Sequence, residues 1–371
     1  MIYLDNASTT RPKDFVKSAV LSAFDNFGNP SSLHRLGMDA EKIIKEARRT
    51  IASEIFADEK NIYFTSGGTE ANNTAILGYA LANRKRGNHL ITTKIEHPSV
   101  LEPFRYLEKL GFDVTYLGVS EGGAISLDEF EKALREDTLL VSVMAVNNET
   151  GVIQPVAKLK EIMKRKSPIA VLHSDCVQAF CKIPLNPKSC GIDMLSASAH
   201  KIHALKGTGA LYIADGIHIS PVIMGGGQER GLRSGTENTA GIAAFSEAVK
   251  GFAKIGQEKR TLLMDKILEN IPKAYVNGTL ENSGYILNVS FSGIKAEILL
   301  HSLEMRGIFV STGSACSSNK PQPSHVLTAM GVSRENIGGA IRFSFCDEDF
   351  DADYVVCALK EEVEKIRKYV R

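Results

Sequence analysis

The chain has 371 residues, of which 43% are hydrophobic, and a formal net charge of +1. This length suits two domains or one large and one small, and the near-neutral charge argues against nucleic acid or membrane surfaces as partners. No apolar run approaches the ~18 residues of a membrane span, and MIYLDNASTT is unlike a secretory signal, so we expect a cytoplasmic protein. Six cysteines without a CxxC pair and nine histidines without paired-ligand spacing predict neither a disulfide framework nor a metal site.

The first part of the chain predicts two helices and a glycine turn. Residues 1–11 are expected to be irregular, and helices are expected over Pro12–Phe27 and Asp39–Phe56, with FGNPSSLHRLG as a loop between them. NIYFTSGGTEANN then predicts a strand, a turn and a helix from Thr69. Free backbone donors at that helix start, beside Gly68, suit a phosphate, and the alternative is an ordinary turn capped by Thr69. A Walker-type nucleotide site lacks its lysine here.

Strands and helices then alternate. The expected strands are HLITTK, DVTYL, LLVSVMAV, IAVLHSD, DMLSASA and ALYIA, with helices over SVLEPFRYLEKL, LDEFEKAL and VAKLKEIMKRK. This alternation predicts an α/β fold with a mostly parallel sheet covered by helices. Ligands in such sheets bind at the carboxyl ends of the strands. His97, Asn148, Asp175 and Lys201 each follow an apolar run, so one crevice could hold all four.

The last part of the chain predicts a smaller α+β unit. A helix leads away from about Thr236, and a second is expected over Gln257–Asn270. The strand YILNVSFSG, a helix over Ala296–Met305, the strand GAIRFSF and a final helix complete this unit.

Two charged residues at strand ends indicate a cofactor. Burial would favour the neutral, nucleophilic amine of Lys201 and make it a Schiff-base candidate, whereas a solvent or ion-paired lysine is the alternative. Asp175 at the end of IAVLHSD needs a cationic partner, and a pyridinium nitrogen would be one. Together the two residues fit a pyridoxal phosphate site, in which the ring acts as an electron sink.

Other polar residues have two interpretations each. His97 could stack on a pyridine ring and relay protons, or be a surface histidine at a turn. Gln178 could donate to a ring phenolate oxygen, or be a polar helix residue. Arg342, inside GAIRFSF, would bind either a substrate carboxylate or an internal acid. Cys316 is the one cysteine in a polar, serine-rich stretch. Its thiol is therefore either an exposed group that is prone to oxidation or a functional nucleophile.

The motifs resemble those of the cysteine desulfurases of the NifS/IscS type, in the class V aminotransferase family of fold-type I pyridoxal phosphate enzymes. The resemblance runs in order through YLDNASTT, FGNPSSLH, FTSGGTEANN, EHPSV, VNNETG, HSDCVQ, SAHK, GGGQERGLRSGTEN, STGSACSS and IRFSF. It implies a large domain over residues 12–255 with a seven-stranded sheet, and a small domain formed by residues 1–11 and 256–371.

The resemblance also implies an activity. L-cysteine would become L-alanine, and its sulfur would pass to Cys316 as a persulfide on a loop that must move, with Lys201 and His97 as the other catalytic residues. Asn148 and Arg342 would bind the substrate carboxylate. The implied cofactor-binding residues are Gly68, Thr69, His97, Asp175, Gln178, Ser198, His200, Lys201 and Thr236.

The implied partners are a second copy of the chain and a sulfur acceptor. In the family, Thr236 reaches the cofactor phosphate of the other subunit, so the sites of a homodimer are completed across the interface. The acceptor would be an iron–sulfur scaffold or a tRNA-thiolation enzyme. The alternatives are a selenocysteine lyase, another aminotransferase of the class, or a non-catalytic sulfur-carrier or nucleotide-binding module. Cys176 stands where alanine is usual and is expected to face away from the cofactor.

Overall fold

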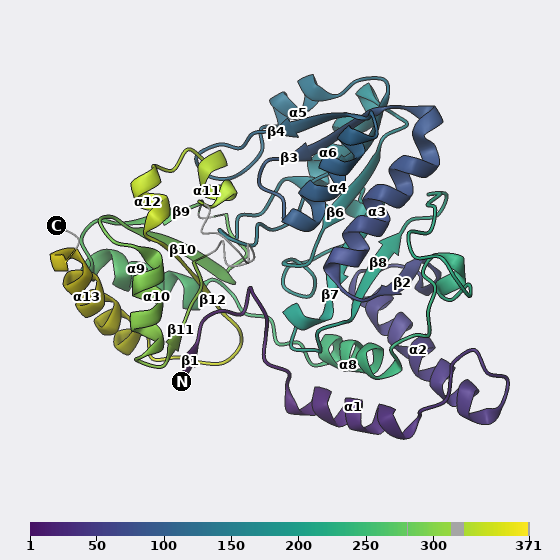
Figure 1. Ribbon diagram of the computed structural model, residues 1–371, viewed down its shortest axis with the longest axis horizontal. Coiled ribbons are helices and arrows are strands. Elements are labelled where there is room, and N and C mark those ends of the chain that lie inside the picture. The colour runs from purple at the N-terminus through teal and green to yellow at the C-terminus, as the bar shows by residue number, and fades with distance from the viewer. Residues whose placement is uncertain (280, 313–322, 370–371) are drawn as a thin grey trace.

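The computed structural model describes residues 1–279, 281–312 and 323–369. A large sheet flanked by helices forms one part of the molecule, and a smaller unit with helices α9, α10 and α13 lies beside it (Figure 1). The expected α/β fold with a mostly parallel seven-stranded sheet is confirmed.

The seven-stranded sheet brings several strand ends to one edge. Its order is β2 (Ile62–Thr65), β8 (Gly209–Ile213), β7 (Met194–Ser198), β6 (Val171–Asp175), β5 (Thr138–Ser142), β3 (His89–Thr93) and β4 (Asp113–Leu117). All neighbours are parallel except that β8 is antiparallel to both β2 and β7. Asp175 on β6 pairs with Ser196 on β7, so the groups that follow these two strands emerge side by side.

Helices cover both faces of this sheet. They are α1 (Asp14–Asp25), α2 (Arg35–Glu54), α3 (Gly68–Asn83), α4 (Pro98–Lys109), α5 (Leu127–Ala133), α6 (Val156–Lys166), α7 (Pro187–Cys190) and α8 (Thr239–Lys250), with 3-10 turns at Glu59–Asn61, Arg84–Arg86, Ala199–Lys201 and Glu229–Gly231. Successive strand residues face opposite sides. On β3, Leu90 packs in the cluster that contains α3 and α4, whereas Ile91 packs in the cluster that contains α2 and α8.

Two helix starts differ from the sequence prediction. Helix α2 begins at Arg35, inside the stretch expected to be a loop, because the His34 side chain caps it by accepting the Gly37 N–H at 3.4 Å. Helix α8 begins at Thr239 and not near Thr236, since the Asn238 side chain accepts the Gly241 N–H at 3.0 Å. In both cases one polar side chain sets the boundary.

The smaller unit has its own core. It contains an antiparallel sheet of β12 (Ala340–Ser344), β10 (Ile286–Phe291) and β9 (Ala274–Asn277), and a parallel pair of β1 (Ile2–Tyr3) and β11 (Ile308–Phe309). Its helices are α9 (Glu258–Asn270), α10 (Ala296–Glu304), α11 (His325–Ala329), α12 (Arg334–Gly338) and α13 (Ala352–Tyr369). Residues 1–11 are therefore not wholly irregular, since the first strand pairs with β11. The domain boundaries given above stay a prediction.

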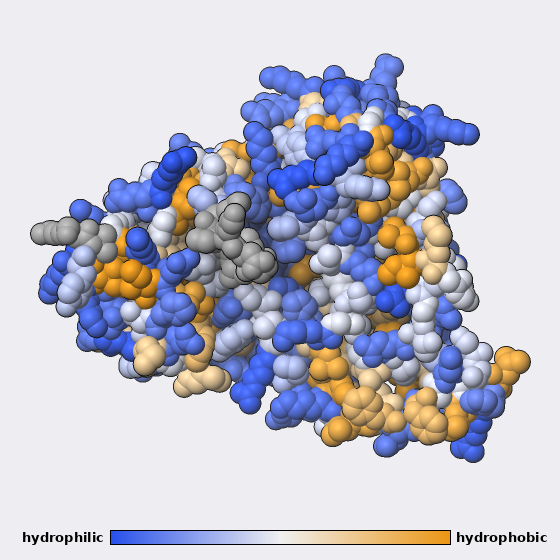
Figure 2. Space-filling view, in the orientation of Figure 1, coloured by the Kyte–Doolittle hydropathy of each residue, from blue (hydrophilic) through white to orange (hydrophobic). Residues whose placement is uncertain are grey.

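Apolar side chains are exposed along α1. Figure 2 shows apolar side chains gathered over α1, where Phe24 is 63% exposed and Leu21 65% exposed. Within the described residues, every helix is too short or too polar to cross a lipid bilayer.

Candidate active site

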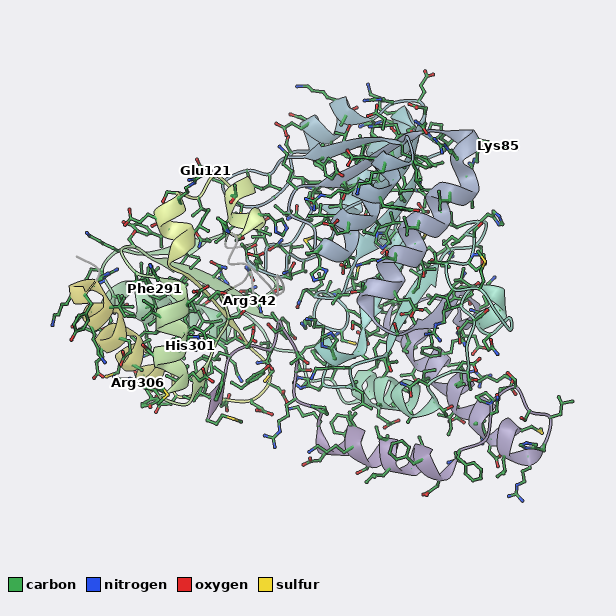
Figure 3. All side chains as sticks on the ribbon, in the orientation of Figure 1. Lys85, Glu121, Phe291, His301, Arg306 and Arg342 are labelled. Atoms are coloured by element: carbon green, nitrogen blue, oxygen red, sulfur yellow. The ribbon has the colours of Figure 1, made fainter. Side chains whose placement is uncertain are left out.

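A cavity of about 260 Å³ lies at the carboxyl ends of the sheet strands, against β12. Figure 3 shows Arg342 of β12 at the junction between the smaller unit and the large sheet. The cavity lining includes these residues that the sequence indicated: Gly68, Thr69, His97, Asn148, Asp175, Gln178, Ser198, His200, Lys201 and Arg342. Thr236 is exposed and does not line the cavity, and Cys316 lies outside the described residues.

Lys201 is held by the N-terminal segment. It follows β7 in the 3-10 turn Ala199–Lys201, and its Nζ donates to the carbonyl oxygens of Ala7 and Ser8, both at 2.6 Å. Gln178 donates from Nε2 to the same Ala7 oxygen at 2.9 Å. Residues from three parts of the chain therefore fix the amine at the cavity wall.

A buried hydrogen-bond chain links Asp175 to His97. Asn72 Nδ2 donates to Asp175 Oδ2 at 2.8 Å and to Ser99 Oγ at 2.9 Å. Ser99 Oγ lies 2.8 Å from His97 Nδ1, which also accepts the Ser99 N–H at 3.1 Å. Because Nδ1 is an acceptor, the proton of the neutral ring is on Nε2. The second carboxylate oxygen of Asp175 accepts the Val177 N–H at 2.9 Å.

Burial keeps the two histidines of the cavity neutral. It lowers the pKa of His97, and it lowers the pKa of His200 to about 4, with the charge of Lys201 acting in the same direction. His97 is also the N-cap of α4, where Pro98 occupies the first helical position. A neutral imidazole can stack on a ring and can exchange a proton through Nε2.

The start of α3 provides the anion-binding end of the cavity. Backbone N–H groups in the first turn of a helix have no partner within that helix, and they attract anions. A Cβ at Gly68 would lie 2.6 Å from Val177 Cγ2, so glycine is required for this close approach. The Ser198 side chain, at the end of β7, also lies close to Gly68, with its Cβ 3.6 Å from the position of a Gly68 Cβ. This arrangement could hold a phosphate.

Arg342 makes one of the two contacts that the sequence left open, the one with an internal acid. Its Nη2 forms an ion pair with Asp5 Oδ1 at 2.9 Å and donates to Ser8 Oγ at 2.6 Å, while Nη1 donates to the Asn148 carbonyl at 2.9 Å. Its Nε is buried and has no hydrogen-bond partner among the described residues. An internal acid is therefore present, and the guanidinium has further N–H groups, the Nε–H among them, that could bind a ligand carboxylate.

The donor set fits pyridoxal phosphate. Asp175 could pair with a ring nitrogen, and the start of α3 suits the phosphate. Buried polar atoms of two lining residues, Asn72 Oδ1 and Arg342 Nε, lack partners among the described residues. Buried polar groups are normally paired, so these atoms indicate a polar ligand.

The residues on either side of the segment that contains Cys316 form hydrogen bonds with Arg342, which lines the cavity, and with Glu149, which follows the lining residue Asn148. Ser311 exchanges backbone hydrogen bonds with Arg342, and Ser324 Oγ donates to Glu149 Oε2 at 2.5 Å. Of the described cysteines, Cys176, Cys181 and Cys346 are buried, and burial raises the pKa of each thiol. None of the described cysteines lines the cavity.

Sequence reasoning missed Asn72, Ser99, Asp5 and Ser8. Asn72 had a usable signal, since it is a polar residue between the buried residues Ala71 and Ala75 of α3. The other three act only through contacts with distant residues.

One group of possible metal donors lies elsewhere in the described part of the chain. Donor atoms of His203, Cys346 and Asp347 lie within 4.8 Å of one another. The ammonium of Lys13 is already 2.9 Å from Asp347 Oδ1 and neutralises it. This group therefore does not form a ready cation site.

Comparisons with known proteins identify the family of this chain. The family model "Aminotransferase class-V" matches residues 2–353. A cysteine desulfurase IscS of Methanosarcina thermophila is 44% identical over 376 residues, which cover 99% of this chain and 93% of that protein. A solved NifS-like protein superposes with a TM-score of 0.90 at 37% identity, covering 98% of this chain and 99% of that one. A solved SspA in complex with cysteine has a TM-score of 0.85 at 35% identity, covering 94% and 100%.

Glu96, next to His97, should make stability depend on pH. Burial raises its pKa from 4.5 to about 8, while Oε1 accepts from Met144 N and Thr93 Oγ1. Between these values the folded protein keeps a proton that the unfolded chain has lost, so stability falls as pH rises. Glu96→Gln should flatten this fall and give a higher urea midpoint than the wild type at pH values near and above 8. Parallel midpoint curves for the two proteins would contradict the assignment.

Proposed function

The chain belongs to the class-V aminotransferase family and is a cysteine desulfurase, and on this premise we propose that Lys201 and Asp175 hold pyridoxal phosphate while Cys316 receives the sulfur of L-cysteine. The observation that carries the proposal is the position of Lys201 and Asp175 at adjacent strand ends in one cavity. A protein that only carries sulfur or binds nucleotides would need neither.

The cofactor would be held from several directions. Lys201 Nζ would bind its aldehyde carbon, Asp175 would hold the ring nitrogen protonated, and His97 would stack on the ring. Gly68, Thr69, Ser198 and His200 would hold the phosphate. When bound, pyridoxal phosphate supplies an electron sink for the bonds broken at the amino acid.

Substrate binding would use Arg342 and Asn148. The Asp5 ion pair and the Asn148 carbonyl fix the plane of the Arg342 guanidinium, so its remaining N–H groups are preorganised for a carboxylate. After the substrate amine has taken the place of Lys201, the Lys201 Nζ would accept the Cα proton. His97 Nε2 would assist proton transfer, because its tautomer is set by Ser99.

Sulfur transfer would use Cys316 as the nucleophile. Its thiolate attacks the substrate sulfur, a new S–S bond forms, and the bond between that sulfur and the substrate carbon breaks. The carbon takes a proton, so L-cysteine and an enzyme thiol become L-alanine and an enzyme persulfide. We place this step at Cys316 because it stands in the polar, serine-rich stretch that resembles the family's sulfur-accepting loop, and none of the described cysteines lines the cavity.

The proposed partners complete the reaction. A homodimer would cover apolar side chains along α1 and would bring the exposed Thr236 to the cofactor phosphate of the other subunit. The persulfide would pass to an iron–sulfur scaffold or a tRNA-thiolation enzyme.

Lys201→Ala should abolish covalent attachment of the cofactor and turnover of cysteine, because no other lysine lines the cavity among the described residues. Borohydride reduction followed by peptide mass spectrometry measures the attachment. Fixation of the cofactor to the variant at the wild-type yield would overturn the assignment.

Arg342→Ala should lower kcat/KM for cysteine by about 10- to 100-fold, as expected for a charge-assisted hydrogen bond of about 1.5–3 kcal/mol. Cofactor content should stay near that of the wild type, and steady-state kinetics with absorbance spectra measure both. Asp5→Asn is the matched variant, since it removes the ion pair and leaves the guanidinium in place. If Asp5→Asn lost as much kcat/KM as Arg342→Ala, the arginine would serve the internal ion pair instead of the substrate.

Cys316→Ser should bind cysteine and change the cofactor absorption, yet release no alanine, because a hydroxyl does not accept the sulfur. Cys176→Ala and Cys346→Ala should retain turnover. Mass spectrometry after incubation with cysteine should find the added sulfur atom on Cys316. Alanine release by Cys316→Ser together with a persulfide on another cysteine would refute the proposed step.

A further inference from the structure

Lys182 is a buried lysine directly behind the cavity wall. It is 8% exposed, and it is absent from the cavity lining. Its Nζ donates to Gln178 Oε1 at 3.0 Å and lies 5.5 Å from the ring centroid of Tyr285. Within the described residues no carboxylate forms an ion pair with it. Burial lowers the pKa of Lys182 to about 7, and the charge of Lys201 adds to this effect.

A buried lysine of this kind lowers the free energy of unfolding. Removing an ammonium from water without a carboxylate partner destabilises the folded state. The backbone before it is also unfavourable, because Cys181 has a φ of +62°, in the left-handed region that side chains with a Cβ seldom occupy. Strained backbone and buried charge of this kind are characteristic of functional sites.

The contacts of Lys182 determine which way the Gln178 amide faces. An amine that donates occupies one side of the amide, and the Ala7 carbonyl, which can only accept, occupies the other at 2.9 Å. Reversing the amide would set its oxygen against the Ala7 carbonyl and its NH2 group against the Lys182 amine. The observed orientation leaves the second Nε2 proton of Gln178 for a bound acceptor.

We propose that Lys182 is a positioning residue of this active site, which holds the Gln178 oxygen and thereby presents the Gln178 N–H to an acceptor oxygen on the cofactor ring. The proposal rests on the proposed function, because that oxygen belongs to pyridoxal phosphate. Lys182 itself does not touch the cofactor or the substrate.

A double-mutant cycle on the full chain tests this role. The variants are Lys182→Met, Gln178→Ala and the double variant, each titrated with pyridoxal phosphate after removal of the cofactor. Lys182→Met should weaken cofactor binding by about two- to tenfold, the range of one hydrogen bond, and shift the pH midpoint of the cofactor absorption band. In the Gln178→Ala background the same substitution should change binding less than twofold.

Further variants separate positioning from structure. Lys182→Arg retains a donor and should restore part of the binding and of the absorption midpoint. Lys160→Met removes a half-buried lysine that pairs with Asp193 and should leave both unchanged. Gln178→Glu keeps Lys182 but replaces the Nε2 donor by an oxygen, so it should weaken cofactor binding at least as much as Gln178→Ala. This variant replaces Lys182→Met in the test if Lys182→Met does not fold.

The outcomes distinguish the two proposals. A wild-type protein that gives no absorption band with pyridoxal phosphate would overturn both. A normal wild-type band with unchanged affinity and midpoint in Lys182→Met would overturn only the role of Lys182. An equal loss in the presence and absence of Gln178 would also overturn it, because the lysine would then act on the structure and not through the amide.

Discussion

The cavity depends on the convergence of donors on the backbone carbonyls of Ala7 and Ser8. Lys201 donates to both, and Gln178 donates to Ala7. A carbonyl oxygen has two lone pairs and no proton, so it can accept two donors at once and cannot compete with either of them. The N-terminal segment is also bound to the turn that follows β7, since Thr10 N donates to the His200 carbonyl at 3.0 Å. A short stretch of backbone therefore sets the position of the Lys201 amine.

The second constraint is the neutral state of the imidazoles. Burial is the main cause that lowers the pKa of both His97 and His200, and the charge of Lys201 acts in the same direction, whereas Asp175 opposes part of the effect at His97. Asp175 is linked to His97 through Asn72 and Ser99, so the carboxylate and the imidazole are oriented together. A change in the hydrogen bonding of Asp175 or of His97 alters the hydrogen bonds of the other residue, because buried polar networks polarise along their length.

The sequence predicted those parts of the molecule that follow from strand order. Asp175 and Lys201 could be placed together because both follow apolar runs, and parallel strands end at one edge of a sheet. The contacts of Asp5 with Arg342 and of Lys182 with Gln178 were not predictable, since they depend on packing between segments or on the orientation of an amide. The start of α2 was missed for a similar reason, because a histidine cap is a weaker signal than serine or aspartate.

The ion pair between Asp5 and Arg342 joins residues 337 positions apart and has a consequence for biosynthesis. The large sheet is complete in sequence once β8 has been made, and its local βα units can fold while the ribosome is still working. The N-terminal segment, which carries the acceptors for Lys201, lacks its partners β11 and Arg342 until the last part of the chain emerges. The contacts that hold the Lys201 amine can therefore form only after nearly the whole chain has been translated, even if the sheet folds earlier.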